Sequence, residues 1–345
     1  MAANATTMKA WIAVQSGRPR DILQLNTTMP LPAMPGPGQI MVQVSYAALN
    51  PGDIKMMAHK IPFKGSTIPG MDFVGKVVQM GPSIASSPSA LEVGSTVAGT
   101  TSMMNVWRGI GILAEYVVIP ANLVVEKPEG LDEHLAAGLF GVVGQTSFVL
   151  TRTANLRKGD KALINGASGG VGSILTQALR AMGVRVTAVS SAKNEGLVRR
   201  LGAEEFVDYQ ACTSLPDYLS SICAGPNGRA FDAIFDCVGN DELFYRSPTY
   251  LQVRGKFLSI EAGPFGIFKL MNWPLVLGGT PRTYQSVFSR PSGDHAEEVL
   301  AWFNKGWIKE VPVDSIFEME DAIQAFEKLA TQRAAGKIII RVVKE

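Results

Sequence analysis

The stretch Lys161-Ala-Leu-Ile-Asn-Gly-Ala-Ser-Gly-Gly-Val-Gly-Ser173 decides the fold of this chain. A short apolar strand is expected at 162–164, and a cluster of glycines follows it. From Val171 to Met182, apolar residues recur at the three- and four-residue spacing of one helical face. Strand, glycine turn and amphipathic helix together are typical of the phosphate-binding corner of a dinucleotide fold.

The glycines of this turn have a physical purpose. They let the backbone approach a pyrophosphate, and the N–H groups at the start of the helix face the anion. A strict G-x-G-x-x-G pattern needs glycine at Ala167, whereas the chain has Gly166-x-x-Gly169-x-x-Gly172. The alternative interpretation is an ordinary strand-to-helix turn, but the flanking strand and helix favour a cofactor site. We expect the binding residues here to be Ser168, Gly169, Gly170 and Val171.

Length and composition limit the class of protein. With 345 residues, 46% of them hydrophobic, the chain can bury a large core and suits two domains better than one. Its net charge of +2, without a basic run, argues against nucleic acid or an anionic membrane as a partner. We expect no apolar stretch long enough to span a bilayer, and the N-terminus lacks a signal pattern.

The cysteines and histidines indicate neither a disulfide framework nor a metal site. The three cysteines form no C-x-x-C pair, which favours free thiols in a reducing, cytoplasmic compartment. The three histidines stand far apart, without the local spacing of zinc ligands. These residues are Cys212, Cys223, Cys237, His59, His134 and His295.

The chain divides into a β-rich part, an alternating part and a mixed tail. Period-two patterns predict strands at 8–14, 39–45, 73–79, 96–99 and 114–119, with a proline- and glycine-rich loop at 29–38. From about Leu135, helical patterns alternate with apolar strands at 162–164, 184–189, 205–208, 232–236 and 256–260. This alternation predicts a parallel sheet with helices on both faces. The tail is expected to hold helices at 295–306 and 318–332 and a strand at 337–343.

Several motifs agree in order and spacing with a known family. They are Ala48-Leu-Asn-Pro-Gly-Asp53, Pro69-Gly-Met-Asp-Phe-Val-Gly75, Gly144-Gln-Thr146, Asn165-Gly-Ala-Ser-Gly-Gly-Val-Gly172, Leu201-Gly-Ala-Glu-Glu-Phe-Val-Asp-Tyr209 and Gly336-Lys-Ile-Ile-Ile-Arg341. In these motifs the chain resembles the medium-chain dehydrogenase/reductase superfamily, in its zinc-free quinone-oxidoreductase and enoyl-reductase branch. The resemblance covers nearly the whole chain past Thr7 and does not specify one substrate.

The resemblance implies an α/β fold with two domains. A GroES-like β-rich domain is expected at 1–134 and 290–345, with an inserted doubly wound Rossmann domain at 135–289. The family's active site lies in the cleft between the domains. The aromatic-rich stretch 264–274 fits the family's substrate-pocket and dimer-edge region, or else a surface loop. The oligomeric state stays open between monomer and homodimer.

The zinc positions of the family can be compared one by one. Zinc alcohol dehydrogenases of this superfamily have a ligand cysteine where Asn50 stands here, and a ligand histidine where Met71 stands. Their structural-zinc lobe holds several cysteines, and the matching stretch 99–114 has none. Because amide and thioether groups are poor zinc ligands, we expect no bound zinc.

The residues after the second strand of the alternating part favour NADPH over NADH. In NAD sites an acidic side chain near that strand end bonds the ribose diol. Here the strand ends in Ser190-Ser-Ala-Lys193, whose hydroxyls and ammonium suit a 2′-phosphate, while Glu195 fits a solvated helix start. In the resembled branch a tyrosine that matches Tyr209 also holds this phosphate.

The resemblance also suggests residues for catalysis and for the nicotinamide. Lys55 matches a lysine that points into the site of related enoyl reductases, and Thr146 matches a residue beside the nicotinamide ring. Each residue also has a purely structural interpretation: Lys55 as a solvated surface lysine, and Thr146 as a threonine that packs within its helix. Tyr46 or water could supply a proton, and Val238 is expected to back the cofactor. The other cofactor-binding residues that we expect are Asn50, Asp53 and Lys337.

The sequence therefore predicts an NADPH-dependent, zinc-independent reductase of activated C=C bonds or quinones. Without a Lewis acid, the chemistry that we expect is hydride transfer from the cofactor to a polarised C=C bond. The protein must then stabilise the oxyanion that this transfer creates. The alternatives are a one-electron quinone reductase and a crystallin-like protein that binds NADPH without catalysis. The expected partner is a small-molecule substrate. The stretches Asn50-Pro-Gly-Asp53 and Leu277-Gly-Gly-Thr-Pro-Arg282 look similar to fungal oxidoreductases, several of which act in secondary metabolism, where a biosynthetic enzyme partner is possible.

Overall fold

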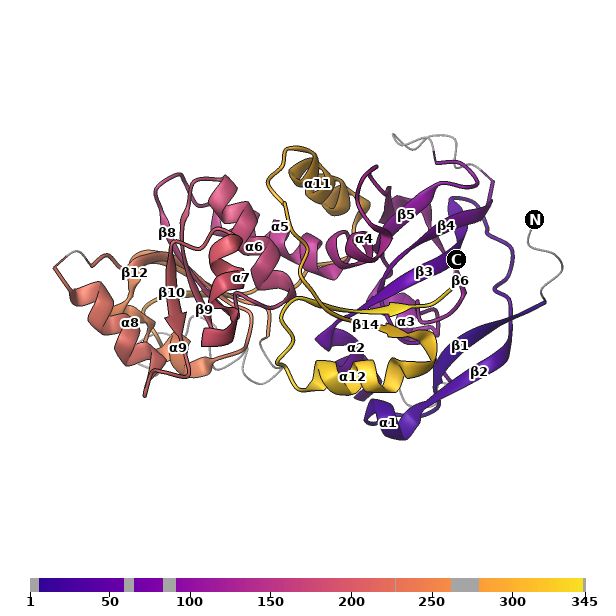
Figure 1. Cartoon of the computed structure of the whole chain (residues 1–345), viewed down its shortest axis with the longest axis horizontal. Coiled ribbons are helices and arrows are strands. Elements are labelled where there is room, and N and C mark those ends of the chain that lie inside the picture. The colour runs from indigo at the N-terminus through magenta and orange to yellow at the C-terminus, as the bar shows by residue number, and fades with distance from the viewer. Residues whose placement is uncertain (1–5, 59–64, 83–90, 227, 262–278, 344–345) are drawn as a thin grey trace. The chain divides into compact units, whose positions relative to one another are not determined.

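The computed structural model describes residues 6–58, 65–82, 91–226, 228–261 and 279–343 (Figure 1). The stretch 264–274 and His59 therefore lie outside the described residues. The chain forms two compact units. The first unit holds Met1–Gln145, Arg290–Ala301 and Val311–Glu345, and the second holds Thr146–Ser289 and Trp302–Glu310.

The first unit is built mainly from strands. Its strands are β1 (Thr7–Ala13), β2 (Leu23–Pro30), β3 (Gln39–Leu49), β4 (Asp72–Met80), β5 (Thr96–Thr100), β6 (Tyr116–Pro120), β7 (Val124–Glu126), β14 (Val313–Glu318) and β15 (Lys337–Arg341). Its helices are α1 (Pro19–Ile22), α2 (Pro51–Ala58), α3 (Met103–Trp107), η1 (Ala121–Leu123), α4 (Glu133–Leu139), η5 (Met319–Asp321) and α12 (Ala322–Ala330).

A seven-stranded sheet organises this unit, in the order β14-β15-β3-β4-β5-β7, with β6 pairing with β3. Strand β15 lies antiparallel to β3, so the C-terminal part of the chain completes a sheet that the N-terminal part begins. The buried side chains Phe326 of α12 and Ile338 and Ile340 of β15 belong to the same hydrophobic cluster as Val42 and Phe73. The C-terminal segment is thus part of the core of the first unit.

The second unit contains a parallel sheet. Its elements are β8 (Lys161–Asn165), α6 (Gly170–Ala181), β9 (Arg185–Ser190), η2 (Ala192–Asn194), α7 (Glu195–Arg200), β10 (Glu205–Asp208), α8 (Leu215–Ala224), β11 (Phe231–Asp236), α9 (Asp241–Tyr245), η3 (Ser247–Thr249), β12 (Leu251–Ser259) and β13 (Thr283–Ser286). Two further helices, α5 (Val142–Ala154) and α11 (Gly293–Asn304), have residues in both units.

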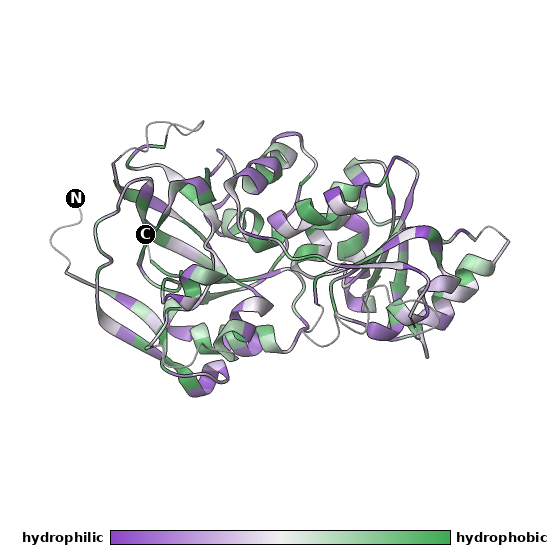
Figure 2. Cartoon of the chain, turned by 180° about the vertical axis from the view of Figure 1, so that it is seen from behind, coloured by the Kyte–Doolittle hydropathy of each residue, from purple (hydrophilic) through white to green (hydrophobic). Residues whose placement is uncertain are grey.

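Six strands form this sheet, in the order β10-β9-β8-β11-β12-β13, and all neighbours pair in parallel. Successive residues of β8 face opposite sides. Ala162 and Ile164 join a cluster with helices α5, α6 and α7, and Leu163 joins one with α8 and α9. In Figure 2, hydrophobic and hydrophilic residues alternate along many helices, as packing of one helical face requires. The predicted parallel sheet with both faces covered is confirmed.

The structure adds strands that the sequence pattern did not predict. Strand β2 extends into the expected loop, and β13 and β14 lie where no strand was expected. All three have partly exposed, polar sequences, so they lack a clear period-two apolar pattern. Each is defined by its pairing partner, which is β1, β12 or β15.

One helical stretch also corrects an expectation about apolar length. Residues Glu133–Ala154, which contain α4 and α5, are long and apolar enough to cross a membrane by length and composition. However, 78% of the apolar window is buried within the structure, as for the core helix of a soluble protein. This stretch is therefore weak support for a membrane span.

Candidate functional site

The glycine turn leaves strand β8 and is tied to the end of β9. Gly166 has a φ of 83°, in the left-handed region that glycine adopts without strain. The N–H groups of Gly166 and Ala167 both donate to the carbonyl oxygen of Val189, each at 3.1 Å. The N–H of Gly169 then donates to the oxygen of Gly166 at 3.1 Å. These bonds place the turn at the carboxyl ends of two neighbouring parallel strands.

Gly172 is the position where helix α6 comes closest to the turn. A Cβ atom on Gly172 would lie 2.3 Å from the oxygen of Gly166 and 2.7 Å from the Cα of Ala167. Both contacts are with backbone, so only glycine fits. The Ala167 methyl group, by contrast, is fully buried in the core of the sheet. The alanine at position 167 thus adds a side chain to the core, and Gly172 allows helix α6 to approach the turn closely.

The order of the strands reverses beside this turn, because β9 and β11 lie on opposite sides of β8. Such a switch point is where open parallel sheets bind dinucleotides. Asn165, at the end of β8, donates to the carboxylate of Asp236, at the end of β11, at 2.9 Å. Asp236 also accepts the N–H groups of Val238 and Asn240, at 3.1 and 2.7 Å. It thereby fixes the loop that carries Val238, whose side chain is 54% exposed.

Sequence reasoning missed Asn194, which connects two of the expected site residues. Its side-chain amide donates to the hydroxyl of Ser168 at 2.9 Å and to that of Ser191 at 3.4 Å. Ser168 belongs to the glycine turn, and Ser191 follows strand β9. The available signal was only an amide in a short polar segment after the strand, which is common in surface loops.

Polar residues follow the end of β9, and the first carboxylate after them along the chain is bonded to another side chain. Ser190 is buried, Lys193 is exposed, and the N–H of Tyr209 donates to the oxygen of Ser190 at 3.3 Å. Glu195 is engaged elsewhere, because its carboxylate accepts a hydrogen bond from Arg199 at 2.7 Å on the same helix. Along the chain, the residues after β9 thus offer hydroxyls and an ammonium before the first carboxylate, while Asp208 of the neighbouring strand β10 lies in register with Ser190.

These observations fit a dinucleotide phosphate. The fit rests on the close approach at Gly172, where the lack of a Cβ lets the start of α6 lie directly against the turn. The first N–H groups of a helix point along its axis and have no intrahelical acceptor. The predicted residues Gly169, Gly170 and Val171 form the start of this helix.

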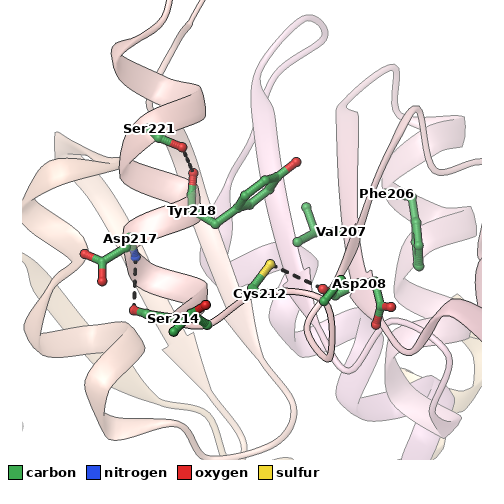
Figure 3. Close-up of a pocket in the computed structure, with 10 residues that line it drawn as sticks. Phe206, Val207, Asp208, Cys212, Ser214, Asp217, Tyr218 and Ser221 are labelled. Atoms are coloured by element: carbon green, nitrogen blue, oxygen red, sulfur yellow. Dashed lines mark hydrogen bonds between the residues drawn. The ribbon is translucent and has the colours of Figure 1, made fainter.

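A cavity of about 490 Å³ lies elsewhere in the second unit, between the edge strand β10 and helix α8 (Figure 3). Asp208 and Asp217 line it, with Tyr218 and Cys212. The thiol of Cys212 donates to the backbone oxygen of Asp208 at 3.3 Å. The Asp217 carboxylate pairs with Arg246, and no residue of the glycine turn lines this cavity, so it is separate from the turn.

The first unit holds a buried polar group that we call the Asn50 cluster, made of Asn50, Asp53, Asp72 and Lys337. Each of these residues is at most 4% exposed. Asn50 donates through its side-chain amide to Asp72 at 2.8 Å and accepts from the Lys337 ammonium at 2.8 Å. Sequence reasoning identified three members but missed Asp72, the carboxylate that pairs with Lys337 at 3.4 Å.

Burial shifts the ionisation of this cluster. It raises the pKa of Asp53 to about 7, although the hydrogen bond from the Asn50 N–H acts in the opposite direction. Burial also lowers the pKa of Lys337, against the attraction of Asp72 and Asp53. One carboxylate oxygen of Asp53, Oδ1, is buried without a hydrogen-bond partner among the described residues.

The other candidates in or beside this unit take different positions. Lys55 lies exposed on α2, two residues after Asp53. Thr146 lies buried on α5, where it is the first residue of the second unit. The Tyr46 hydroxyl accepts from Arg341 at 3.4 Å, and the Tyr46 ring lies 6.0 Å from the His134 ring. The Tyr46 hydroxyl is therefore engaged with Arg341 in a half-buried contact.

Metal and thiol chemistry find little support in the side chains. Among the residues that the structure describes, no three His, Cys, Asp or Glu side chains gather in a group that could hold a metal ion. Met71 is buried and packs with Met56 and Val106. Burial raises the pKa of the Cys212, Cys223 and Cys237 thiols, which keeps them protonated and poorly nucleophilic.

Two family descriptions match the sequence. Residues 36–129 match the alcohol dehydrogenase GroES-like domain, and residues 201–340 match a family described as zinc-binding dehydrogenase. The first match covers most of the sheet in the first unit. The second begins after the glycine turn and ends in β15.

Known relatives resemble the chain over its whole length. The medium chain reductase pydE of Acremonium sp. is 34% identical and covers 98% of this chain and 100% of its own. The trans-enoyl reductase poxH of Penicillium oxalicum is 31% identical, over 99% of both chains. The structure of the quinone oxidoreductase from Coxiella burnetii has a TM-score of 0.79 and 25% identity, over 97% of this chain and 99% of that one.

Proposed function

The chain belongs to the medium-chain dehydrogenase/reductase superfamily and is an oxidoreductase, and on this basis we propose that it is an NADPH-dependent, zinc-independent reductase of activated C=C bonds. The substrate class is an enone, an enal or an enoyl intermediate. One observation carries the zinc-independent part. Asn50 occupies the place of a ligand cysteine, and its amide is committed to Asp72 and Lys337 inside a buried cluster. The relatives that are named enoyl reductases support the substrate class.

NADPH is the proposed hydride donor, held at the glycine turn and the end of β9. We assign its phosphates to Ser168 and the start of α6, and its 2′-phosphate to Ser190, Ser191, Lys193 and Tyr209. The pairing of Glu195 with Arg199 supports this choice, because it engages the first carboxylate that follows this strand end along the chain. Val238 is assigned to the face of the bound dinucleotide, next to Gly166.

The residues of the chain must handle the charge that hydride transfer creates. Hydride addition to the β-carbon of an enone leaves negative charge on the carbonyl oxygen. We assign Lys55 to stabilise this oxygen through its ammonium, and Thr146 to position the nicotinamide. Protonation of the α-carbon then completes the reduction, with water as the proton source.

The function is tested by following NADPH oxidation with a panel of enones, enals, enoyl thioesters and quinones. We expect turnover with the conjugated C=C substrates and one reduced product per NADPH. Turnover confined to quinones, with semiquinone signals in electron paramagnetic resonance, favours the one-electron reductase instead. NADPH binding without any turnover favours the non-catalytic protein. Stoichiometric zinc in protein prepared without added metal would overturn the metal-free mechanism.

The variant Lys55→Ala tests the proposed oxyanion contact. We expect kcat to fall roughly 100-fold, because a charge-assisted hydrogen bond to the developing oxyanion contributes about 2–3 kcal/mol. The Kd of NADPH, measured by fluorescence titration, should stay within twofold of the original value. An exposed lysine in strand β4, Lys76, provides the matched control as Lys76→Ala. Equal kcat for Lys55→Ala and the original protein removes Lys55 from the mechanism.

The variant Lys193→Ala tests the choice of cofactor. Losing one contact to a 2′-phosphate should raise the KM for NADPH roughly tenfold, since about 1.4 kcal/mol corresponds to a factor of ten. The KM for NADH should hardly change, because NADH has no 2′-phosphate. Steady-state kinetics with both cofactors give the ratio. A parallel loss with both cofactors would show that Lys193 does not read the phosphate.

A cytoplasmic location is part of the same proposal. It is supported by the three cysteines, which are free thiols in the structure. Free thiols persist in reducing compartments, where disulfides are rare.

A further inference from the structure

The Asn50 cluster joins four segments that are far apart in the sequence. Asn50 follows β3, Asp53 lies in the first turn of α2, Asp72 begins β4 and Lys337 begins β15. All four side chains are almost completely buried. Burying charged groups costs free energy, so the cluster is weak evidence for stability and we consider another role for it.

Asp72 connects the cluster to helix α5. Its Oδ2 atom accepts hydrogen bonds from Asn50, at 2.8 Å, and from Lys337, at 3.4 Å. Its Oδ1 atom accepts the N–H of Val142, the first residue of α5, at 2.9 Å. A Cβ on Gly141 would lie 2.2 Å from the Asp72 carboxyl carbon, so the carboxylate packs directly against the chain that enters the helix.

Asp53 and Lys337 connect the cluster to helix α2. The Asp53 carboxylate accepts the Asn50 N–H at 2.8 Å, and the Asp53 N–H donates to the backbone carbonyl oxygen of Asn50 at 2.9 Å. The carboxylate thus satisfies the free Asn50 N–H at the start of α2, while the Asn50 side chain bonds to Asp72 and Lys337 instead of capping the helix. Lys337 donates to the Leu49 oxygen at 2.9 Å, just before the same turn.

The Lys337 ammonium is fully used inside the cluster. An ammonium has three N–H donors. The structure gives it three acceptors, which are the oxygen of Leu49, Oδ1 of Asn50 and Oδ2 of Asp72. In the structure, all three N–H donors of Lys337 therefore bond to the protein itself.

Resting on the proposed function, we propose that the Asn50 cluster is a positioning unit that holds the first turns of α2 and α5, and with them Lys55 and Thr146. Lys55 lies two residues after Asp53, and Thr146 lies one helical turn after Val142. Asp72 and Lys337 then act on the reaction only through these two helices. The direct cofactor contact that the sequence predicts for Asn50, Asp53 and Lys337 stays a separate prediction.

The double variant Asp72→Asn/Lys337→Met separates this role from simple stabilisation. Lys337→Met alone leaves a buried unpaired carboxylate and should unfold readily, whereas the double variant removes both charges and should regain most of the melting temperature. We expect its kcat to stay at least tenfold below that of the original protein, with the Kd of NADPH within twofold. Hydrogen exchange at the amides of Asp53 and Val142 should be faster.

A matched control is Lys161→Met, which removes another buried lysine that pairs with a carboxylate, Glu205, at 3.0 Å. Lys161 begins β8, at the opposite end from the glycine turn, so kcat should be retained. Recovery of kcat in the double variant would overturn the positioning role, and so would a weakened Kd for NADPH. If the original protein reduces no substrate, the proposed function fails, and unchanged exchange at the two amides would then refute the cluster's role independently.

Discussion

Gly172→Ala is expected to weaken NADPH binding by roughly 100-fold or more. The new methyl group would lie 2.3 Å from the Gly166 oxygen and 2.7 Å from the Ala167 Cα. Neither backbone atom can rotate away, so the start of α6 and the turn must separate. The N–H groups at the start of α6 would then lose their alignment with a phosphate, and each such charge-assisted bond contributes about 1.5–3 kcal/mol.

The measurement is a fluorescence titration with NADPH, together with the melting temperature. Overpacking should also lower stability by about 1–3 kcal/mol. The matched control is Gly196→Ala in α7, where an added Cβ would meet no described atom within 4 Å. That variant should bind NADPH normally. Normal binding by Gly172→Ala would contradict the assignment of the phosphates to this turn.

The second unit could be predicted well because its pattern is local. Strand β8, the glycine turn and helix α6 follow one another within the stretch 161–181, so their periodicities can be read directly. The apolar strands of the parallel sheet are buried on both faces and appear as short hydrophobic runs. Strand β13 of this unit was missed, as was β14 of the first unit. Both are short and partly exposed, and strands distant in the sequence pair with them.

The candidate site shows the same limit. Motif resemblance pointed to Asn50, Asp53 and Lys337, but a linear sequence does not show that Lys337 meets Asp72, 265 residues away. Asn194 was missed because an amide in a polar segment has no distinctive pattern, and only the fold brings it to Ser168. Side chains that connect distant segments are thus the part of a site that sequence reasoning finds last.

Asp53→Asn is expected to change how stability depends on pH. In the unfolded chain the Asp53 carboxyl has an ordinary pKa of 3.8, whereas burial raises it to about 7 in the folded protein. The folded state therefore holds this proton more tightly, and the contribution of the group to stability is fully present below about pH 4. It is lost as the pH rises to about 7, because the unfolded chain ionises first.

Asparagine removes this loss and keeps an oxygen for the Asn50 N–H. Between pH 4.5 and pH 8, the free energy of unfolding should therefore fall by about 2–4 kcal/mol more in the original protein than in Asp53→Asn, as about 1.4 kcal/mol per pH unit implies. Urea unfolding at both pH values measures this difference. Glu92→Gln, at an exposed carboxylate, controls for the loss of one charge. Parallel pH profiles for Asp53→Asn and the original protein would mean that the buried carboxyl is ionised throughout, stabilised by Lys337. That stabilisation would act through space, because the three N–H donors of Lys337 already bond to Leu49, Asn50 and Asp72.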